Sequence, residues 1–233
     1  MADSITIQSP SGAMPVVRCL PPGGTGPGLV VVQEIFGVSD YVRQRCEDLA
    51  GAGYVVYAPE LYWRLPEAPQ LNEESEEYVQ QGMAAAAQLD VELAIEDVCD
   101  TFAALRNSPE VQGSSAGLLG YCMGGGLAFA AAARCHPDAL VSYYGSALPR
   151  LTDLAPRVTC PQLHIWGDAD AFIDSATQAE VRQAIEAGGR SVTWLTYEGA
   201  NHAFDNPHPL FHHAEASAQA WEATLDFLAT HLS

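Results

Sequence analysis

AGLLGYCMGGGLAF occupies residues 116–129. It begins as an apolar run typical of a buried strand, passes through a tight turn between Gly120 and Gly124, and continues as an Ala-rich helix. This strand, turn and helix form the pattern of a nucleophile elbow, with Cys122 in the place of the usual serine. Glycine on both sides lets the two backbones approach closely while the central residue is held strained and exposed. The segment predicts that Cys122 points into a reaction site.

Short β-rich runs and longer helical stretches alternate along the rest of the chain. The expected strands are residues 28–33, 54–58, 117–121, 139–143, 162–166 and 192–197. The clearest expected helices are residues 41–52, 90–106 and 214–232. This alternation predicts an α/β fold, a mainly parallel twisted sheet with helices on both faces, and reactive groups in the loops after the strands. The length of 233 residues fits a single domain over residues 1–233.

The segment between Pro59 and Asp90 is the least regular part of the chain. It starts with Tyr62 and Trp63, contains prolines, and carries an acidic run at residues 72–77. Two interpretations stay open: a lid over the active site, or a solvated surface excursion.

Composition excludes several classes of function. A net charge of −19 is incompatible with an extended phosphate-binding surface, so nucleic acid is not an expected partner. The start MADSITIQSP has no secretory pattern, and no run approaches the roughly 20 apolar residues of a membrane helix, so we expect a cytoplasmic protein without a membrane partner. The six cysteines form no CxxC pair, which favours reduced thiols over disulfides or a zinc site.

The position of Cys122 suits a nucleophile. A thiol at a helix N-terminus lies near the positive end of the helix dipole, which favours the thiolate that attacks carbonyls. The backbone N–H of Met123 would then donate to the oxyanion. The alternative is that Cys122 is a small buried hydrophobic residue at a strand end.

An elbow nucleophile should be followed along the chain by an acid and then a histidine. Asp168 and Asp170 follow the expected strand 162–166, and His202 follows the strand 192–197. We interpret His202 as the base and Asp170 as the acid that orients it, with Asp168 as the competing acid. Either aspartate could instead cap its own turn, and His202 could be a solvated loop residue.

The chain resembles the dienelactone hydrolase family of the α/β-hydrolase superfamily. The resemblance rests on QEIFG at residues 33–37, PELY at 59–62, GYCMGG at 120–125, YYG at 143–145 and the loops around Asp170 and His202. It implies a compact α/β-hydrolase domain that hydrolyses small esters or lactones with the triad Cys122, Asp170 and His202. It also implies no metal and no organic cofactor.

The resemblance gives two further residues a role. Glu34 corresponds to a family glutamate that interacts with the nucleophile and influences its thiol–thiolate state, which agrees with the proton affinity of a nearby carboxylate. Its alternative role is a cap or ion pair at a strand end. Ile35 is similar to the second backbone donor to the oxyanion.

This chain differs from members of the family in the residues that would bind a carboxylate group of the substrate. Family members that act on the muconate-derived lactone use arginines in the lid region and just beyond the histidine. Residues 203–206 and 71–90 of this chain contain no Arg or Lys. We therefore expect a less acidic substrate, unless Arg64 reaches the pocket.

Aromatic residues close to the expected catalytic loops suggest an apolar pocket for a small-molecule ester or lactone, although each of them is equally compatible with the core. They are Phe36, Tyr62, Trp63, Tyr144, Phe172 and Phe204. His208, His212 and His213 form another cluster, but no carboxylate motif accompanies it, and we expect no metal site there.

Ester or lactone hydrolysis is the leading hypothesis. A thioester or amide hydrolase keeps the same nucleophile, because the triad does not fix the leaving group. A thiol-based sensor or ligand-binding protein on this scaffold would oxidise Cys122 instead of acylating it. We expect the chain to act as a monomer or weak homodimer.

Overall fold

The computed structural model describes residues 2–188 and 191–232. Eight strands form one twisted sheet in the order β1-β2-β4-β3-β5-β6-β7-β8. β1 and β2 are antiparallel to each other, and β2 is antiparallel to β4, whereas all other neighbours are parallel. The mixed, mostly parallel sheet confirms the predicted α/β class.

The elements agree closely with the sequence pattern in the centre of the sheet. The strands are β1 (Ala2–Ser9), β2 (Gly12–Cys19), β3 (Gly26–Val32), β4 (Val55–Pro59), β5 (Val111–Tyr121), β6 (Ala139–Tyr143), β7 (Gln162–Gly167) and β8 (Val192–Tyr197). The α-helices are α1 (Asp40–Gly51), α2 (Tyr78–Ala86), α3 (Val91–Arg106), α4 (Met123–Cys135), α5 (Ser175–Glu186) and α6 (Ala214–His231), and short 3₁₀ turns lie at Leu61–Arg64, Leu148–Arg150 and Thr152–Arg157. Each expected strand and helix is present within a few residues.

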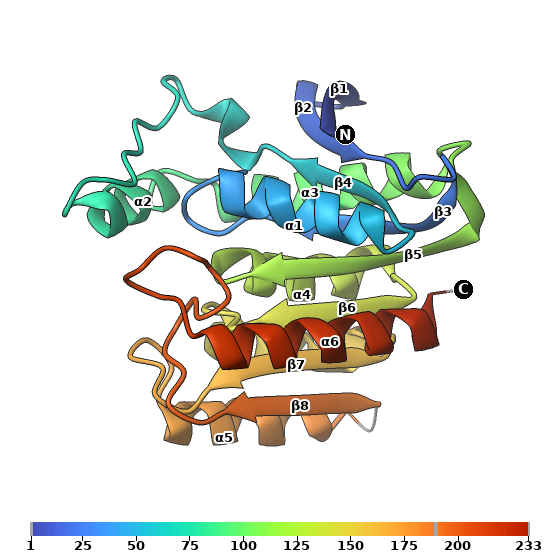
Figure 1. The fold of residues 1–233 in the computed structure, drawn as a ribbon. Coiled ribbons are helices and arrows are strands. Elements are labelled where there is room, and N and C mark those ends of the chain that lie inside the picture. The colour runs from blue at the N-terminus through green and yellow to red at the C-terminus, as the bar shows by residue number, and fades with distance from the viewer. Residues whose placement is uncertain (1, 189–190, 233) are drawn as a thin grey trace.

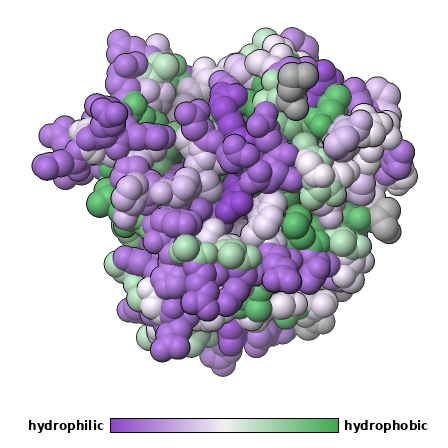
Figure 2. Space-filling model, in the orientation of Figure 1, coloured by the Kyte–Doolittle hydropathy of each residue, from purple (hydrophilic) through white to green (hydrophobic). Residues whose placement is uncertain are grey.

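Helices cover both faces of the sheet. α1 and α6 lie on one face, and α3, α4 and α5 lie on the other (Figure 1). α4 is buried along nearly its whole length, which explains why its Ala-rich sequence shows no polar stripe. The outer surface is mainly hydrophilic on the face shown in Figure 2, in keeping with the net charge of −19.

The parallel strands all end at the same edge of the sheet. β3, β5, β7 and β8 deliver the loops that contain Glu34, Cys122, Asp170 and His202, and α2 projects from this same side (Figure 1). No helix in the described part of the chain has the length and apolar character that crossing a membrane requires. The fold thus gathers the candidate residues at one edge, as parallel topology demands.

Candidate active site

Cys122 occupies a strained turn between β5 and α4. Its backbone has φ 52° and ψ −116°, in a region that residues with a side chain rarely adopt. Three hydrogen bonds hold it there: its N–H donates to the Tyr143 carbonyl at 3.0 Å, and its own carbonyl accepts from Gly125 N at 3.0 Å and Ser146 N at 3.1 Å. The elbow conformation is therefore imposed by β6 and α4 together.

The flanking glycines allow the close approach of α4 to the sheet. A Cβ atom on Gly120 would overlap the Gly124 carbonyl, and one on Gly124 would overlap the carbonyl oxygens of Val32 and Gln33. No flexible side chain could move aside, because the overlapping atoms belong to the backbone. The spacing of these two glycines is thus a packing requirement of the turn.

Cys122, His202 and Asp170 form one relay. His202 Nε2 lies 3.1 Å from Cys122 Sγ, and His202 Nδ1 lies 2.8 Å from Asp170 Oδ2. All three residues are at least nine-tenths buried. This is the geometry of a nucleophile, a base and an orienting acid.

The two competing aspartates have different partners. Asp170 Oδ1 accepts from the N–H groups of Phe172 at 2.8 Å and Ile173 at 3.0 Å, which leaves Oδ2 for His202. Asp168 Oδ1 instead accepts from Gly199 N at 2.7 Å. Asp168 therefore ties the two loops together, and Asp170 is the acid in contact with the imidazole.

The charge on His202 depends on its two neighbours. Burial lowers the pKa of His202, but the Cys122 sulfur and the Asp170 carboxylate outweigh burial and raise this pKa to about 10. An imidazolium beside Cys122 stabilises a thiolate. The arrangement therefore places a positively charged imidazolium beside Cys122 at neutral pH.

Glu34 is buried in the same site with one free oxygen. Its Oε1 accepts from Asn206 Nδ2 at 2.7 Å, while its Oε2 has no hydrogen-bond partner in the described structure. Burial raises the pKa of Glu34 from its usual 4.5 to about 8, against the opposing effect of Asn206. At neutral pH the carboxyl is therefore mainly protonated and does not repel a thiolate.

This raised pKa predicts a pH-dependent stability. The Glu34 carboxyl keeps its proton up to about pH 8 in the folded state, whereas it loses this proton near pH 4.5 in the unfolded state. The contribution of this proton to the free energy of unfolding is therefore complete below pH 4.5 and is lost as the pH rises from 4.5 to about 8. Glu34→Gln should flatten this fall and stabilise the protein by at least about 1 kcal/mol near neutral pH. Urea unfolding of parent and variant between about pH 5 and pH 8 measures it. Parallel stability curves for the two proteins would contradict it.

The two expected oxyanion donors flank Cys122. Met123 is the first residue of α4, so its N–H has no acceptor within the helix. Ile35 lines the cavity above Cys122, and its carbonyl accepts from Tyr62 Oη at 2.7 Å, which fixes the peptide. Tyr62 thus acts on the backbone of Ile35.

A cavity of about 100 Å³ lies over Cys122. Its walls are mainly apolar and include no Lys or Arg: Glu34, Ile35, Phe36, Val79, Met83, Cys122, Ser146, Phe172, His202, Ala203 and Phe211. Val79 and Met83 belong to α2, and Tyr78 of the same helix stacks on Phe36 with ring centroids 4.0 Å apart. α2 therefore forms one wall of the cavity, in line with the lid interpretation of the segment before Asp90.

Phe36 and Phe172 line this cavity, whereas the other four aromatic residues expected near the pocket and Arg64 do not. Tyr144 and Phe204 are fully buried behind His202, with the Tyr144 ring 5.2 Å from the imidazole and 5.4 Å from Phe204. Tyr62 lines a separate cavity beside Phe36. These three rings surround the site without lining this cavity, and their contact with substrate stays a prediction.

Arg64 does not reach the site. Its guanidinium makes two hydrogen bonds to the buried carboxylate of Asp97, at 2.6 and 3.0 Å, and lies over the Trp63 ring. Ion pairing with a fully buried acid holds this arginine in place. The cavity over Cys122 consequently has no Lys or Arg among its described lining residues.

Several positioning residues were missed from the sequence. The Asn201 side-chain oxygen accepts from Ala171 N at 2.9 Å and from His202 N at 2.7 Å, so it joins the acid loop to the histidine loop. Gln178 donates to the carbonyls of Gly167 and Ile173, both at 2.9 Å, and clamps the two ends of the acid loop. Polar residues in loops are too common for their pattern to reveal such bridges.

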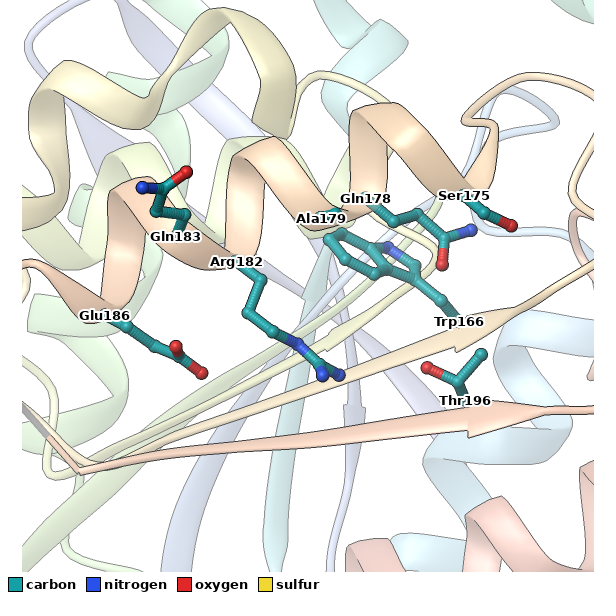
Figure 3. Close-up of a pocket in the computed structure, with 8 residues that line it drawn as sticks. All are labelled: Trp166, Ser175, Gln178, Ala179, Arg182, Gln183, Glu186 and Thr196. Atoms are coloured by element: carbon teal, nitrogen blue, oxygen red, sulfur yellow. The ribbon is translucent and has the colours of Figure 1, made fainter.

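Gln178 also borders a second cavity, which has no part in the triad. This cavity of about 380 Å³ lies between α5 and β8, where Trp166 and Arg182 face the hollow (Figure 3). None of Cys122, Asp170 and His202 lines it. Gln178 connects this cavity to the active site, because it lines the cavity and also holds the loop that carries Asp170.

Asp205 anchors the histidine loop. Its fully buried carboxylate accepts from Arg45 at 2.6 and 2.9 Å, from Tyr41 Oη at 2.6 Å and from Ser217 Oγ at 2.6 Å. Tyr41 and Arg45 belong to α1, and Ser217 belongs to α6. Three residues beyond His202, the loop is therefore tied to two helices on one face of the sheet.

The histidine cluster has local roles. His208 Nε2 contacts the Glu73 carbonyl at 3.0 Å, and the ring of His213 caps the start of α6 by accepting from Ala216 N. The described residues contain no group of three His, Cys, Asp or Glu side chains placed to hold a metal ion.

Comparison with known proteins gives a consistent assignment. The sequence pattern described as "Dienelactone hydrolase family" matches residues 14–232. A carboxymethylenebutenolidase of Pseudomonas putida is 32% identical over 98% of this chain and 97% of its own length, and a putative carboxymethylenebutenolidase of Azospirillum brasilense is 33% identical over 90% of each. The crystal structure of a putative dienelactone hydrolase from Klebsiella pneumoniae superposes with a TM-score of 0.85, 26% identity and 98% coverage of both chains.

Proposed function

Because the chain belongs to the dienelactone hydrolase family and is a hydrolase of that type, we propose that it cleaves small esters or lactones through an acyl-enzyme on Cys122. The observation that carries this proposal is the continuous relay from Cys122 Sγ through His202 to Asp170, with contacts of 3.1 and 2.8 Å. The relatives named carboxymethylenebutenolidase support lactone opening as the reaction class.

The reaction proceeds in two halves. The Cys122 sulfur attacks the carbonyl carbon, and the tetrahedral oxyanion accepts from the N–H groups of Met123 and Ile35. Protonated His202 then gives its proton to the departing alkoxide, which leaves an acyl thioester on Cys122. His202 next takes a proton from water, the resulting hydroxide displaces the sulfur, and the acid is released. Asp170 holds the imidazole in orientation and stabilises its charged form.

Glu34 would influence the nucleophile in the proposed cycle. Its protonated carboxyl lines the same cavity and carries no charge that would act on the His202 imidazolium. An ionised Glu34 would compete with Asp170 for the imidazolium charge and would repel the thiolate. The raised pKa of Glu34 therefore favours the attacking form of Cys122 at neutral pH.

The cavity favours a small uncharged acyl group. Apolar walls from Phe36, Val79 and Met83 desolvate the substrate, and a carboxylate there would find no Lys or Arg among the described lining residues, while His202 is already paired with Asp170. The net charge of −19 also repels anionic substrates as they approach the protein.

We therefore expect neutral acetate or butyrate esters to be turned over at least about 100-fold more efficiently, in kcat/KM, than esters whose acyl group bears a carboxylate; about 3 kcal/mol of uncompensated burial corresponds to this ratio. A matched pair such as p-nitrophenyl butyrate and p-nitrophenyl hemisuccinate gives the measurement. Equal efficiency on both esters would contradict the proposed specificity.

Trapping the intermediate tests the mechanism directly. Acid quenching during turnover of p-nitrophenyl acetate should yield an acetylated peptide that contains Cys122. Stable oxidation of Cys122 without any acyl adduct would favour a thiol-based sensor instead. Turnover of thioesters in preference to oxygen esters would favour the thioester hydrolase.

A further inference from the structure

Two of the six thiols open onto one surface cavity away from the triad. Cys99 lies in the middle of α3, and Cys135 is the last residue of α4. Both are half-buried, whereas the other four cysteines are buried. They line a cavity of about 480 Å³ together with Arg64, Arg134 and four other residues: Pro10, Ser11, Glu96 and Asp100. A small polar oxidant therefore has access to both sulfurs.

The two thiols interact across the interface between α3 and α4, which lie on the same face of the sheet (Figure 1). Cys99 Sγ also lies 3.9 Å from the carbonyl oxygen of Ala131, one helical turn before Cys135. Cys99 therefore reaches the turn of α4 that ends in Cys135, and both residues line the same cavity.

Their surroundings make Cys99 the more reactive of the pair. The hydrogen bond from Cys135 lowers the pKa of Cys99, and the Arg134 guanidinium adds to this effect, so that together they outweigh burial. Burial instead raises the pKa of Cys19 and Cys160, the latter to about 12. Since the thiolate is the nucleophile towards peroxides, attack should begin at Cys99.

We propose that Cys99 and Cys135 form a reversible redox pair that closes to an intramolecular disulfide on exposure to a peroxide. The Cys99 sulfur attacks one peroxide oxygen, an S–O bond forms as the O–O bond breaks, and the departing hydroxide is protonated to water. The Cys135 sulfur then attacks the Cys99 sulfur, the S–S bond forms as the S–O bond breaks, and a second water leaves. Two thiols lose two electrons, and one hydrogen peroxide is reduced to two waters.

The cross-link would enclose the part of the chain that carries the elbow. Residues 99–135 include β5, Cys122 and all of α4. The bond lies at the far end of α4 from Cys122, about 20 Å away at 1.5 Å per residue. It would therefore stabilise the fold by restricting the unfolded chain while leaving the cavity over Cys122 unchanged.

Peptide mapping after limited hydrogen peroxide treatment tests the pair. We expect one cross-linked peptide that joins Cys99 to Cys135, its reversal by dithiothreitol, and a melting temperature several degrees higher in the oxidised form than in the reduced form. Cys99→Ser and Cys135→Ser should each abolish the cross-link and the melting shift, whereas Cys160→Ser should keep both. The experiment is repeated with Cys122→Ala, so that oxidation of the proposed nucleophile does not enter the readout.

Persistence of both residues as free thiols under peroxide that oxidises Cys122 in the parent would overturn the proposal. So would a disulfide between two copies of the chain, or one between Cys99 and a different cysteine. These readouts are independent of ester hydrolysis, so a failure of the proposed function leaves the disulfide test intact.

Discussion

Cys122→Ala is expected to lower kcat/KM for a neutral ester by at least about a thousandfold and to leave the melting temperature within a few degrees of the parent. The activity falls because Cys122 is the hydrogen-bond partner of His202 Nε2 in the described structure, whereas the nearby Ser146 hydroxyl accepts from Cys122 Sγ at 3.8 Å and makes no hydrogen bond to the imidazole there. Removal of one triad residue from a comparable enzyme lowers kcat by several orders of magnitude. Stopped-time assays with p-nitrophenyl butyrate and thermal unfolding measure the two effects.

Cys99→Ala is the matched control for this prediction, because it makes the same change at a cysteine outside the active site. It should retain the activity of the parent. His202→Ala should lose activity to a similar extent as Cys122→Ala, since the two residues act as a unit. Parent-like turnover in Cys122→Ala would eliminate the acyl-enzyme mechanism.

Asp205→Ala is expected to lower the free energy of unfolding by about 3–5 kcal/mol, which is the typical cost of breaking a buried ion pair by removing one partner. Arg45 would lose both of its contacts to Asp205 and keep only the longer ion pair with Asp48 at 3.3 Å, and Tyr41 and Ser217 would each lose an acceptor. Urea unfolding of parent and variant measures the loss.

The same substitution should impair catalysis at temperatures where the variant is folded. Asp205 anchors the loop that carries His202 and Asn206, so its loss is expected to lower kcat by about tenfold or more through misplacement of the imidazole, with a smaller change in KM. Glu92→Gln serves as the control, because its pair with Arg134 is exposed and contributes little. A loss below about 1 kcal/mol for Asp205→Ala would show that the buried network has no anchoring role.

The central strands were predictable because each is a short apolar run that must be buried on both faces. β6 has the predicted bounds, and β5 ends at the predicted residue. β8 also has the predicted bounds, although it is an edge strand whose residues are at most partly buried. β1 and β2 were missed, since these antiparallel strands at the sheet edge lack a continuous buried run. α2 was also missed: it has only nine residues, and no side chain caps its start.

The expected oxyanion donors act through backbone N–H groups and were easier to anticipate from the sequence than residues expected to contact the substrate through their side chains. Met123 follows from the elbow itself, because the first N–H of α4 is free wherever that helix begins. Arg64, Tyr144 and Phe204 have suitable chemistry and lie close in sequence to site residues, but their partners are remote. Asp97 holds Arg64 from 33 positions away, and no local pattern reports such a pairing.

The sequence by itself determined the turn at Cys122, because the two glycines and the apolar strand before them act within a few residues of the nucleophile. It also determined the order of cysteine, acid and histidine along the chain. Only the tertiary structure decided which aspartate contacts His202, which aromatic residues meet the cavity, and how Asp205 joins α1 to the histidine loop across 160 positions. The physical reason is that loop conformation and side-chain direction depend on partners brought together by the sheet, whereas glycine-dependent backbone approach is encoded locally.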